Sequence, residues 1–290
     1  MKKNRVVEGA VHGVFAALGG VSVGCVAVIS VYLIISGIPA VREIGLGEFL
    51  LGRTWASTAA APKFGILPFI LTSVYGTAGA LVLGVPTGFL TAVYLAKFAP
   101  ARVRRVMEGA VNLLAGIPSV VYGLVGMLVL VPGIRKVFRV PDGASLLAAI
   151  VVLAVMILPS LIKVSVTALD SVPREYEEAS LALGATATET AFRVSVPAAK
   201  SGIAAAVVLG AGRAVGEAMA VMMVAGNVAN MPSLFQSVRF LTTAVASEMA
   251  YSSPSSLQRD ALFSIALVLY VFIMLINAAL NVILKRRGER

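Results

Sequence analysis

The chain has 290 residues, of which 59% are hydrophobic and 13% are charged, and its mean hydropathy is +0.94. A soluble domain is usually about 45–50% apolar and about 25% charged, so the composition excludes a soluble fold. The 24 Lys and Arg residues outnumber the 14 Asp and Glu residues, for a formal net charge of +10, but they stand in short clusters between long apolar runs. This distribution indicates membrane topology rather than affinity for nucleic acid.

Six apolar runs are long enough to cross a membrane as helices, for which about 20 residues are needed. They cover residues 14–36, 68–96, 106–131, 145–169, 200–226 and 258–284. The first run follows basic residues, as in a signal peptide, but its apolar part exceeds an h-region of about 7–15 residues. We therefore expect a retained span, with the alanines at 59–61 as a weak rival cleavage site.

These runs predict an all-α integral membrane protein with two parts. Residues 1–67 hold the first span and an outer loop, and residues 68–290 form a five-span core that includes a cytoplasmic loop at 170–200. Three Gly-x-x-x-Gly spacings, at 20/24, 84/88 and 212/216, predict close contacts between helices. Prolines at 86, 118 and 159 interrupt spans and release carbonyl groups that neighbours or a wet cavity must satisfy, which favours a bundle with an interior path.

The basic residues outside the spans favour cytoplasmic positions for both termini. In this orientation, 14 of them lie on the cytoplasmic side and eight on the outer side, as the positive-inside rule requires. Arg135, Lys136 and Arg139 depart from the bias, because they crowd one predicted outer loop.

The chain lacks the residues that most enzymatic sites need. Cys25 is the only cysteine, so neither an intrachain disulfide nor a cysteine metal cluster forms. A Ser-His-Asp triad or a paired-histidine zinc site needs a histidine beside its partners, and the only histidine, His12, lies close to the N-terminus. No Gly-Lys dipeptide occurs, so the chain has no Walker A loop. We expect no enzyme activity from this chain itself.

The loop at 170–200 predicts two short helices exposed to the cytoplasm. Pro173 suits the first turn of a helix, and Gly184 can supply its left-handed stop. Thr186 has the capping-box spacing for a second helix, which ends near Pro197.

We interpret this hairpin as a docking element for a cytoplasmic partner. Helices bend less than loops, so a rigid hairpin can transmit a push, with Ala179, Leu183 and Phe192 as apolar contacts in a groove of the partner. A DNA-binding helix-turn-helix is the poorest alternative, because five acids and three bases give the segment a net charge of −2. A purely structural hairpin is the other alternative.

The hairpin resembles the EAA loop of ABC importer permeases. Residues 178–180 read Glu-Ala-Ser, Gly184 follows, and residues 194–197 (Val-Ser-Val-Pro) close the pattern in register. Serine replaces the second alanine of the family triplet. The resemblance implies that six residues couple the chain to an ATPase: Glu178, Ala179, Ser180, Leu183, Gly184 and Pro197.

Two more segments, residues 115–123 (AGIPSVVYG) and 212–221 (GRAVGEAMAV), are similar to permeases of phosphate-specific importers. Residues 222–227 (MMVAGN) are closer to the PstC type of subunit than to the PstA type. The resemblance, from about residue 68 onward, implies a type I importer permease (MetI-like) fold with alternating access in a prokaryotic inner membrane. It also implies the partners: a PstA-like permease subunit, two PstB-like subunits that bind ATP and Mg²⁺, and a PstS-like phosphate-binding protein. This chain would then bind no cofactor itself.

Arg213 lies near the middle of the predicted span 200–226, where an arginine costs about 2.5–3.5 kcal/mol on insertion scales. Glu217 is four residues later, on the same face of a continuous helix, and can neutralise it. One interpretation is a structural ion pair. The interpretation we favour is that Arg213 faces the translocation path and binds phosphate through its planar fork. Ser119, beside a proline break, and Asn112 are further candidates for the lining.

Three alternatives to a phosphate permease remain open from the sequence. A permease for another oxyanion, such as molybdate or sulfate, would share these motifs. A secondary transporter driven by an ion gradient would have no use for the hairpin. A membrane scaffold without transport activity would tolerate replacement of Arg213 and Glu217 together.

Overall fold

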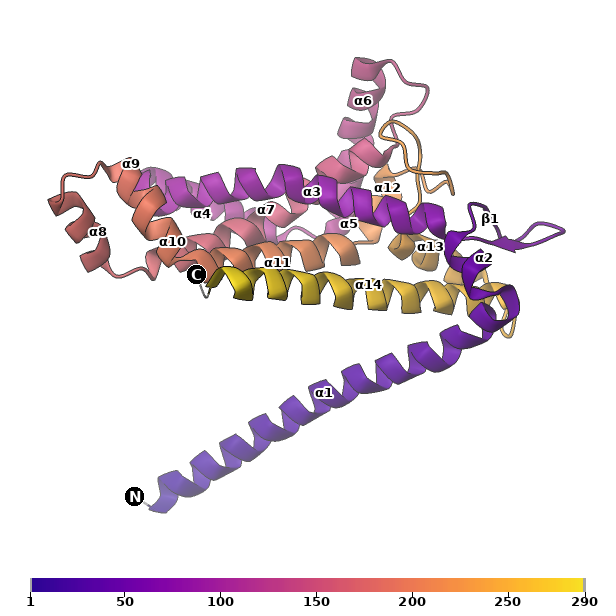
Figure 1. Cartoon of the computed structure of the whole chain (residues 1–290), viewed down its shortest axis with the longest axis horizontal. Helices are drawn as coiled ribbons and strands as arrows, with labels where there is room; N and C mark the ends of the chain where they lie inside the picture. Colours follow the sequence, from indigo (N-terminus) through magenta and orange to yellow (C-terminus); the bar gives the residue numbers. More distant parts are fainter. Residues whose placement is uncertain (1, 289–290) are drawn as a thin grey trace.

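The computed structural model describes the backbone of residues 2–288 and the side chains of residues 11–279. The chain forms an elongated bundle of long helices that run roughly along one axis (Figure 1). The longest helices are α1 (Lys2–Ile44), α3 (Leu67–Val93), α7 (Leu146–Asp170), α11 (Lys200–Gly216) and α14 (Leu257–Gly288).

Shorter elements connect and extend these helices. The short helices are α2 (Leu46–Leu51), α4 (Ala101–Gly116), α5 (Ser119–Val125), α6 (Val131–Phe138), α8 (Arg174–Ala182), α9 (Ala187–Thr190), α10 (Val196–Ala198), α12 (Met219–Val224) and α13 (Leu241–Glu248). Three π-helical turns (Tyr94–Phe98, Gly126–Leu130 and Ala191–Ser195) and a 3₁₀ turn (Met249–Tyr251) continue neighbouring helices. Strands β1 (Trp55–Ala56) and β2 (Lys63–Phe64) form a small antiparallel hairpin, with Trp55 opposite Phe64.

The predicted all-α membrane architecture is confirmed. Within the described residues, five helical segments are long and apolar enough to cross a membrane, and a sixth span results if the pair Ala187–Ala198 and Lys200–Gly216, bent by 72°, is counted as one. The predicted break at Pro118 in the span 106–131 is confirmed, because the residue before a proline is disfavoured in the α conformation. The predicted interruptions at Pro86 and Pro159 were wrong, since both prolines lie inside continuous helices. One predicted boundary was also wrong. The predicted span 200–226 ends its first helix at Gly216.

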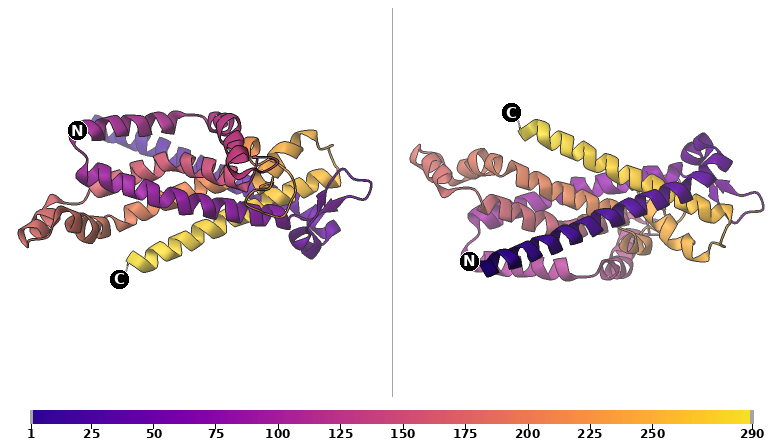
Figure 2. Two further views of the ribbon diagram at one scale, coloured as in Figure 1. Left: turned by 90° about the horizontal axis from the view of Figure 1, so that it is seen from above. Right: turned by 90° about the horizontal axis from the view of Figure 1, so that it is seen from below.

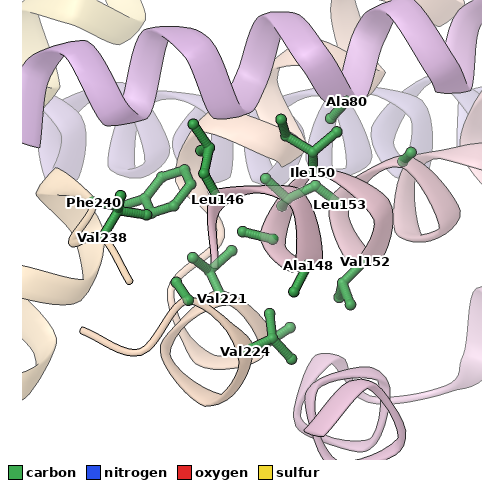
Figure 3. Packing of buried hydrophobic residues seen from close by; sticks show 14 of the residues in the cluster. Ala80, Leu146, Ala148, Ile150, Val152, Leu153, Val221, Val224, Val238 and Phe240 are labelled. Carbon is green, nitrogen blue, oxygen red and sulfur yellow. The ribbon is translucent and has the colours of Figure 1, made fainter. Parts of the chain in front are cut away.

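Helix α7 forms the centre of the bundle and packs against α3 and α11. Figure 3 shows its Ile150 beside Ala80 of α3, with Val221 and Val224 of α12 on another side of the same helix. The predicted contact at the 84/88 glycine pair is confirmed, because a Cβ on Gly84 would lie 2.7 Å from Ile157 Cδ1. The glycines at 20/24 and 212/216 have nothing within 4 Å of a Cβ, so they make no such contact within the described chain.

Helix α1 packs on the bundle only along its C-terminal part and then diverges from it (Figures 1 and 2). The rings of Tyr32 and Phe263 meet edge to face at 5.6 Å, and the Ser30 and Tyr270 hydroxyls are hydrogen-bonded at 2.7 Å. Farther toward the N-terminus the apolar surface is uncovered, with Val23 71% exposed. The start of α1 and the end of α14 lie toward the end of the bundle that carries α8 and α9 (Figure 1).

A polar network fastens β1 to the opposite end of the bundle. Glu248 of α13 forms an ion pair with Arg239 and accepts hydrogen bonds from Trp55 Nε1 at 3.1 Å and Ser57 Oγ at 3.0 Å. Arg239 also lies 5.8 Å from the ring centre of Phe69 in α3. The loop after α1 is therefore held to α13 by a half-buried carboxylate with several donors.

Candidate functional site

A helical hairpin stands at one end of the bundle, as the sequence predicts (Figure 1). The chain enters α8 after Pro173 and leaves it at Gly184, whose φ of 89° is a conformation that glycine tolerates best. Thr186 Oγ1 accepts from the Glu189 amide, and the Glu189 carboxylate accepts from the Thr186 amide at 3.0 Å. This predicted capping box is confirmed. It starts the second arm of the hairpin, which runs through α9 and a π-helical turn into α10 at Pro197.

Glu177 of α8 fastens this hairpin to the bundle. Its carboxylate forms an ion pair with Lys97, and Ser195 Oγ donates to Glu177 Oε1 at 2.7 Å. Lys97 Nζ also donates to the carbonyl oxygen of Leu169 at 2.9 Å, so the ammonium group bridges α8 and the end of α7. Partial burial disfavours the charged carboxylate, but the hydrogen bonds from Lys97 and Ser195 outweigh it and hold the pKa of Glu177 below its ordinary value.

The six predicted coupling residues divide into exposed and supporting side chains. Glu178 and Ala179 are exposed, and Leu183 is 90% exposed. Ser180 points inward instead, since its hydroxyl lies 2.9 Å from that of Thr190 and joins the two arms. Gly184 forms the turn, and Pro197 is exposed near the end of the second arm. An exposed face on a rigid internal support is what a docking element needs.

The sequence analysis did not identify Glu177, Lys97 or Ser195 as functional candidates. Glu177 stands beside Glu178 in the sequence, and nothing in the local pattern distinguishes the carboxylate that turns inward from the one that faces solvent. Lys97 and Ser195 both lie in π-helical turns, a geometry that is frequent at functional sites. Both side chains contact Glu177 of α8, and a π-helical turn has no sequence pattern of its own.

Two of the spans predicted from the sequence, 106–131 and 200–226, are broken inside the bundle. α4 gives way to α5 across Ile117 and Pro118, and α11 gives way to α12 across Glu217 and Ala218. The Tyr122 hydroxyl donates to the Leu114 carbonyl at 2.8 Å and so satisfies a carbonyl that the first break releases. Ser119, one of the predicted lining residues, is half-buried at the start of α5.

The two breaks lie beside each other because α5 and α12 pack in parallel. A Cβ on Gly123 would lie 2.8 Å from Ala220 Cα, and a Cβ on Gly126 would lie 2.8 Å from Val224 Cγ1. Contacts thus advance along both helices in the same direction. Gly123 is the fifth residue of α5 and Ala220 is the second residue of α12, so the two helices start within about one turn of each other.

This close packing gives a prediction for Gly123. In Gly123→Ala, the new methyl group meets backbone of α12 and the Met223 sulfur at 2.9 Å, so we expect a loss of about 1–3 kcal/mol in stability. Gly109→Ala is the matched control in α4, where nothing lies within 4 Å of a Cβ. There we expect a gain of about 0.5–1 kcal/mol from helix propensity. Thermal unfolding of the detergent-purified chain measures both, and equal midpoints for the two variants would contradict the packing.

Glu217 does not extend the helical face of Arg213, which corrects the expected ion pair. α11 ends at Gly216, and Glu217 has the extended angles φ −73° and ψ 126°. Its Oε1 accepts from the Ala220 amide at 3.0 Å, and its carbonyl accepts from Thr242 Oγ1 at 2.8 Å. None of the ion pairs among the described residues joins it to Arg213. The carboxylate therefore satisfies the backbone at the start of α12.

Arg213 is half-buried at the end of α11, and few of its N–H donors form hydrogen bonds within the described residues. Its Nη1 lies 3.5 Å from Ser160 Oγ of α7, which is the one hydrogen bond to its side chain that the described residues provide. Tyr122 of α5 lies within electrostatic range of it. A guanidinium group carries five N–H donors, so most of them are available to an anion.

Polar residues follow one face of α7 from Ser160, which lies beside Arg213, toward the hairpin. Ser160, Lys163 and Thr167 are spaced by three and four residues and so share a helical face. Lys163 and Thr167 are exposed and line a cavity of about 570 Å³ below the hairpin. Both also line a smaller cavity of about 300 Å³ with Asn112 of α4. Asn112 is thus placed along this face and not at the breaks.

A bundle of membrane-crossing helices with two adjacent breaks, an arginine with free donors and a rigid terminal hairpin belongs to the class of membrane transport subunits. Residues 84–289 match the family described as the inner membrane component of binding-protein-dependent transport systems. The chain belongs to this family, which confirms the relationship indicated by the EAA-like loop. It is an ABC transporter permease subunit of the inner membrane.

Relatives and solved structures agree with this assignment. The probable ABC transporter permease YqgH of Bacillus subtilis is 40% identical over 86% of this chain and 83% of its own length. The phosphate transport system permease PstC of Haemophilus influenzae is 34% identical over 84% of this chain and 82% of its own. An inward-facing MetNI methionine ABC transporter matches with a TM-score of 0.58 at 22% identity, over 77% of this chain and 94% of that one. At this identity the structural likeness shows the fold alone, and it confirms the predicted MetI-like fold.

Proposed function

We propose that the chain is a permease subunit of an ATP-driven importer that carries inorganic phosphate across the inner membrane. The observation that carries the proposal is Arg213, a half-buried guanidinium beside two broken spans with a single weak hydrogen bond. An arginine fork binds two phosphate oxygens at once. The names of the PstC relatives and the similarity of residues 115–123 and 212–221 to phosphate permeases support phosphate as the substrate.

In this proposal the path runs from the two breaks along the polar face of α7. Ser119 and Glu217 line it at the breaks, with Glu217 holding the start of α12 in place. Lys163 is a second cation nearer the hairpin, and Asn112 lies beside it. A path with a small number of cationic groups holds the anion weakly enough to release it. A complete cage of such groups would bind the anion too tightly for transport.

The hairpin couples this path to ATP in other subunits. Its exposed apolar side chains, including Tyr176, Leu181 and Leu183, dock in a groove of a PstB-like ATP-binding subunit that holds ATP and Mg²⁺. A PstA-like permease completes the channel, and a PstS-like protein delivers phosphate at the far end. Both termini are then cytoplasmic, which is supported by the ends of α1 and α14 lying toward the hairpin end of the bundle. The chain itself holds no cofactor.

Uptake by membrane vesicles tests the proposal. Vesicles that contain the chain with its co-purifying subunits are expected to accumulate radiolabelled phosphate only when ATP is supplied on the hairpin side and the binding protein on the other. Excess sulfate or molybdate is expected to compete poorly. Uptake that survives ATP depletion but stops with an ionophore would replace the proposal with a secondary transporter, and strong competition by molybdate or sulfate would change the substrate.

A further inference from the structure

Arg104, in the first turn of α4, joins this helix to the base of the hairpin. Its Nη1 donates to Asp170 Oδ1 at 3.3 Å, and its Nη2 forms an ion pair with Asp170 Oδ2. Its Nε donates to Glu108 Oε1 at 2.7 Å, one turn farther along α4. Paired hydrogen bonds between a guanidinium and one carboxylate fix the relative orientation of the two groups. Arg104 is thus held by its own helix while it binds α7.

Asp170 stands where the hairpin leaves the bundle. It is the last residue of α7, and α8 begins four residues later, at Arg174. The connection between them is short and packed, since the Ser171 amide donates to the Thr167 carbonyl at 3.1 Å and Val172 is buried. A displacement of α8 therefore reaches Asp170 with little slack.

Helix α4 packs only lightly on the rest of the bundle. It runs along the edge of the bundle (Figure 2), and Val111 is the only buried residue among its 16, all of which the structure describes. A cavity of about 300 Å³ lies between α4 and α7, with Glu108 and Asn112 on the α4 side. An element with few buried contacts moves more readily than a packed one, so α4 can follow the groups attached to its ends.

The far end of α4 is one of the two helix breaks. The helix ends at Gly116, directly before the break that precedes α5. The bond from the Tyr122 hydroxyl to the Leu114 carbonyl ties this end to α5. From Arg104 to Gly116 the helix is uninterrupted and rises by about 18 Å. The guanidinium and the break are therefore at opposite ends of one stiff segment.

We propose that Arg104 is a positioning residue for transport, which carries the movement of the hairpin from Asp170 along α4 to the break that lines the path. The inference rests on the proposed function, because it names the route by which the hairpin acts on that path. This attachment is separate from the ion pair of Glu177 with Lys97, which ties α8 to the end of α3. Helix α3 is continuous, whereas α4 belongs to a broken span.

Exchange of the two charges in the reconstituted transporter tests the proposal. The proteoliposomes contain the chain with its co-purifying subunits. Arg104→Asp and Asp170→Arg each place like charges at the contact, so each is expected to lower the phosphate transported per ATP hydrolysed by about three- to tenfold. The double variant restores opposite charges, with one long and one short side chain, and is expected to recover the ratio to within about twofold.

Two further variants control for charge and for folding. Arg105→Asp makes the same change at an exposed neighbour that forms no ion pair in the described chain, and it is expected to leave the transport ratio unchanged. Arg104→Gln removes the charge without placing like charges together. It is expected to lower the ratio in the same direction as Arg104→Asp even where the reversed charge prevents folding.

The position of α4 distinguishes this role from general stabilisation. Spin labels on Gly109→Cys in α4 and Val82→Cys in α3 are placed at exposed positions, in a Cys25→Ser background that removes the only native cysteine. Trapping with ATP and vanadate is expected to change the distance between the labels. The change is expected to disappear in Arg104→Gln and to persist in Arg105→Asp and in the charge exchange.

Four results would overturn the proposal. They are no distance change on trapping in the labelled chain with Arg104 intact, an unaltered change in Arg104→Gln, equal transport losses in Arg105→Asp, and losses in the single variants that the exchange leaves unrestored. Failure of the proposed function is distinguishable, because transport of another oxyanion alters the uptake assay and leaves the ATP-dependent distance change in place.

Discussion

Arg213→Ala is expected to reduce phosphate uptake by about 10- to 100-fold while ATP hydrolysis by the assembled transporter continues. The range corresponds to the loss of about 1.5–3 kcal/mol for hydrogen bonds to a charged group. The chain is expected to fold normally, because Arg213 has no ion-pair partner in the described residues and its removal leaves only the Ser160 hydroxyl without a weak donor. Uptake and ATPase activity are measured in the same proteoliposomes.

Two further substitutions decide whether phosphate uptake depends on the charge of Arg213, on the geometry of its guanidinium group or on the overall basicity of the chain. Arg213→Lys keeps the charge but loses the planar fork, so an intermediate uptake rate is expected. Arg105→Ala removes an exposed arginine of α4 that forms no ion pair in the described chain, and it is expected to leave uptake unchanged. Near-normal uptake in Arg213→Ala would end the pathway role. Equal losses in Arg105→Ala would assign the effect to overall charge.

The membrane architecture was predictable from the sequence because its determinants are local. Runs of about 20 apolar residues specify spans, and Gly184 and the capping box at Thr186 specify the hairpin from its own residues. The helix ends inside the predicted spans were harder. Pro118 was a visible breaker, but no proline marks the end of α11 at Gly216. That end depends on the Glu217 carboxylate reaching the Ala220 amide and on the distant Thr242 hydroxyl.

The candidate site was predictable only in part for the same reason. Arg213 was identifiable from its cost in an apolar run, but its partner was not, since Ser160 is 53 residues away in sequence. Glu217 seemed the natural partner because a spacing of four residues places two side chains together on a continuous helix. The break in the helix removes that premise. Long-range contacts between polar residues in apolar segments carry no local pattern from which they can be read.

Substitutions of the adjacent acids Glu177 and Glu178 in α8 are expected to have different effects, because only Glu177 contacts the bundle. Glu177→Gln removes the ion pair with Lys97, whereas Glu178→Gln changes an exposed carboxylate by the same chemistry. We expect Glu177→Gln to lower phosphate transported per ATP hydrolysed by about 5- to 50-fold, because the loss of about 1–2.3 kcal/mol from a hydrogen-bonded ion pair lets the hairpin move without α3 and α7. Measured in the same assay, Glu178→Gln is expected to weaken ATPase docking instead, with the transport ratio nearly unchanged.

The charge states fix the conditions for this test. The pKa of Glu177 lies below its ordinary value, so the interaction is fully present at neutral pH and is lost only as the pH falls through that lowered pKa. Transport ratios are therefore compared between pH 6 and pH 8, where they are expected to be constant with respect to this group. In the double variant Lys97→Met, Glu177→Gln, the combined loss is expected to be smaller than the sum of the single losses, because one interaction is removed twice. Additive losses, or equal transport ratios for Glu177→Gln and Glu178→Gln, would show that this ion pair does not carry the movement of the hairpin into the bundle.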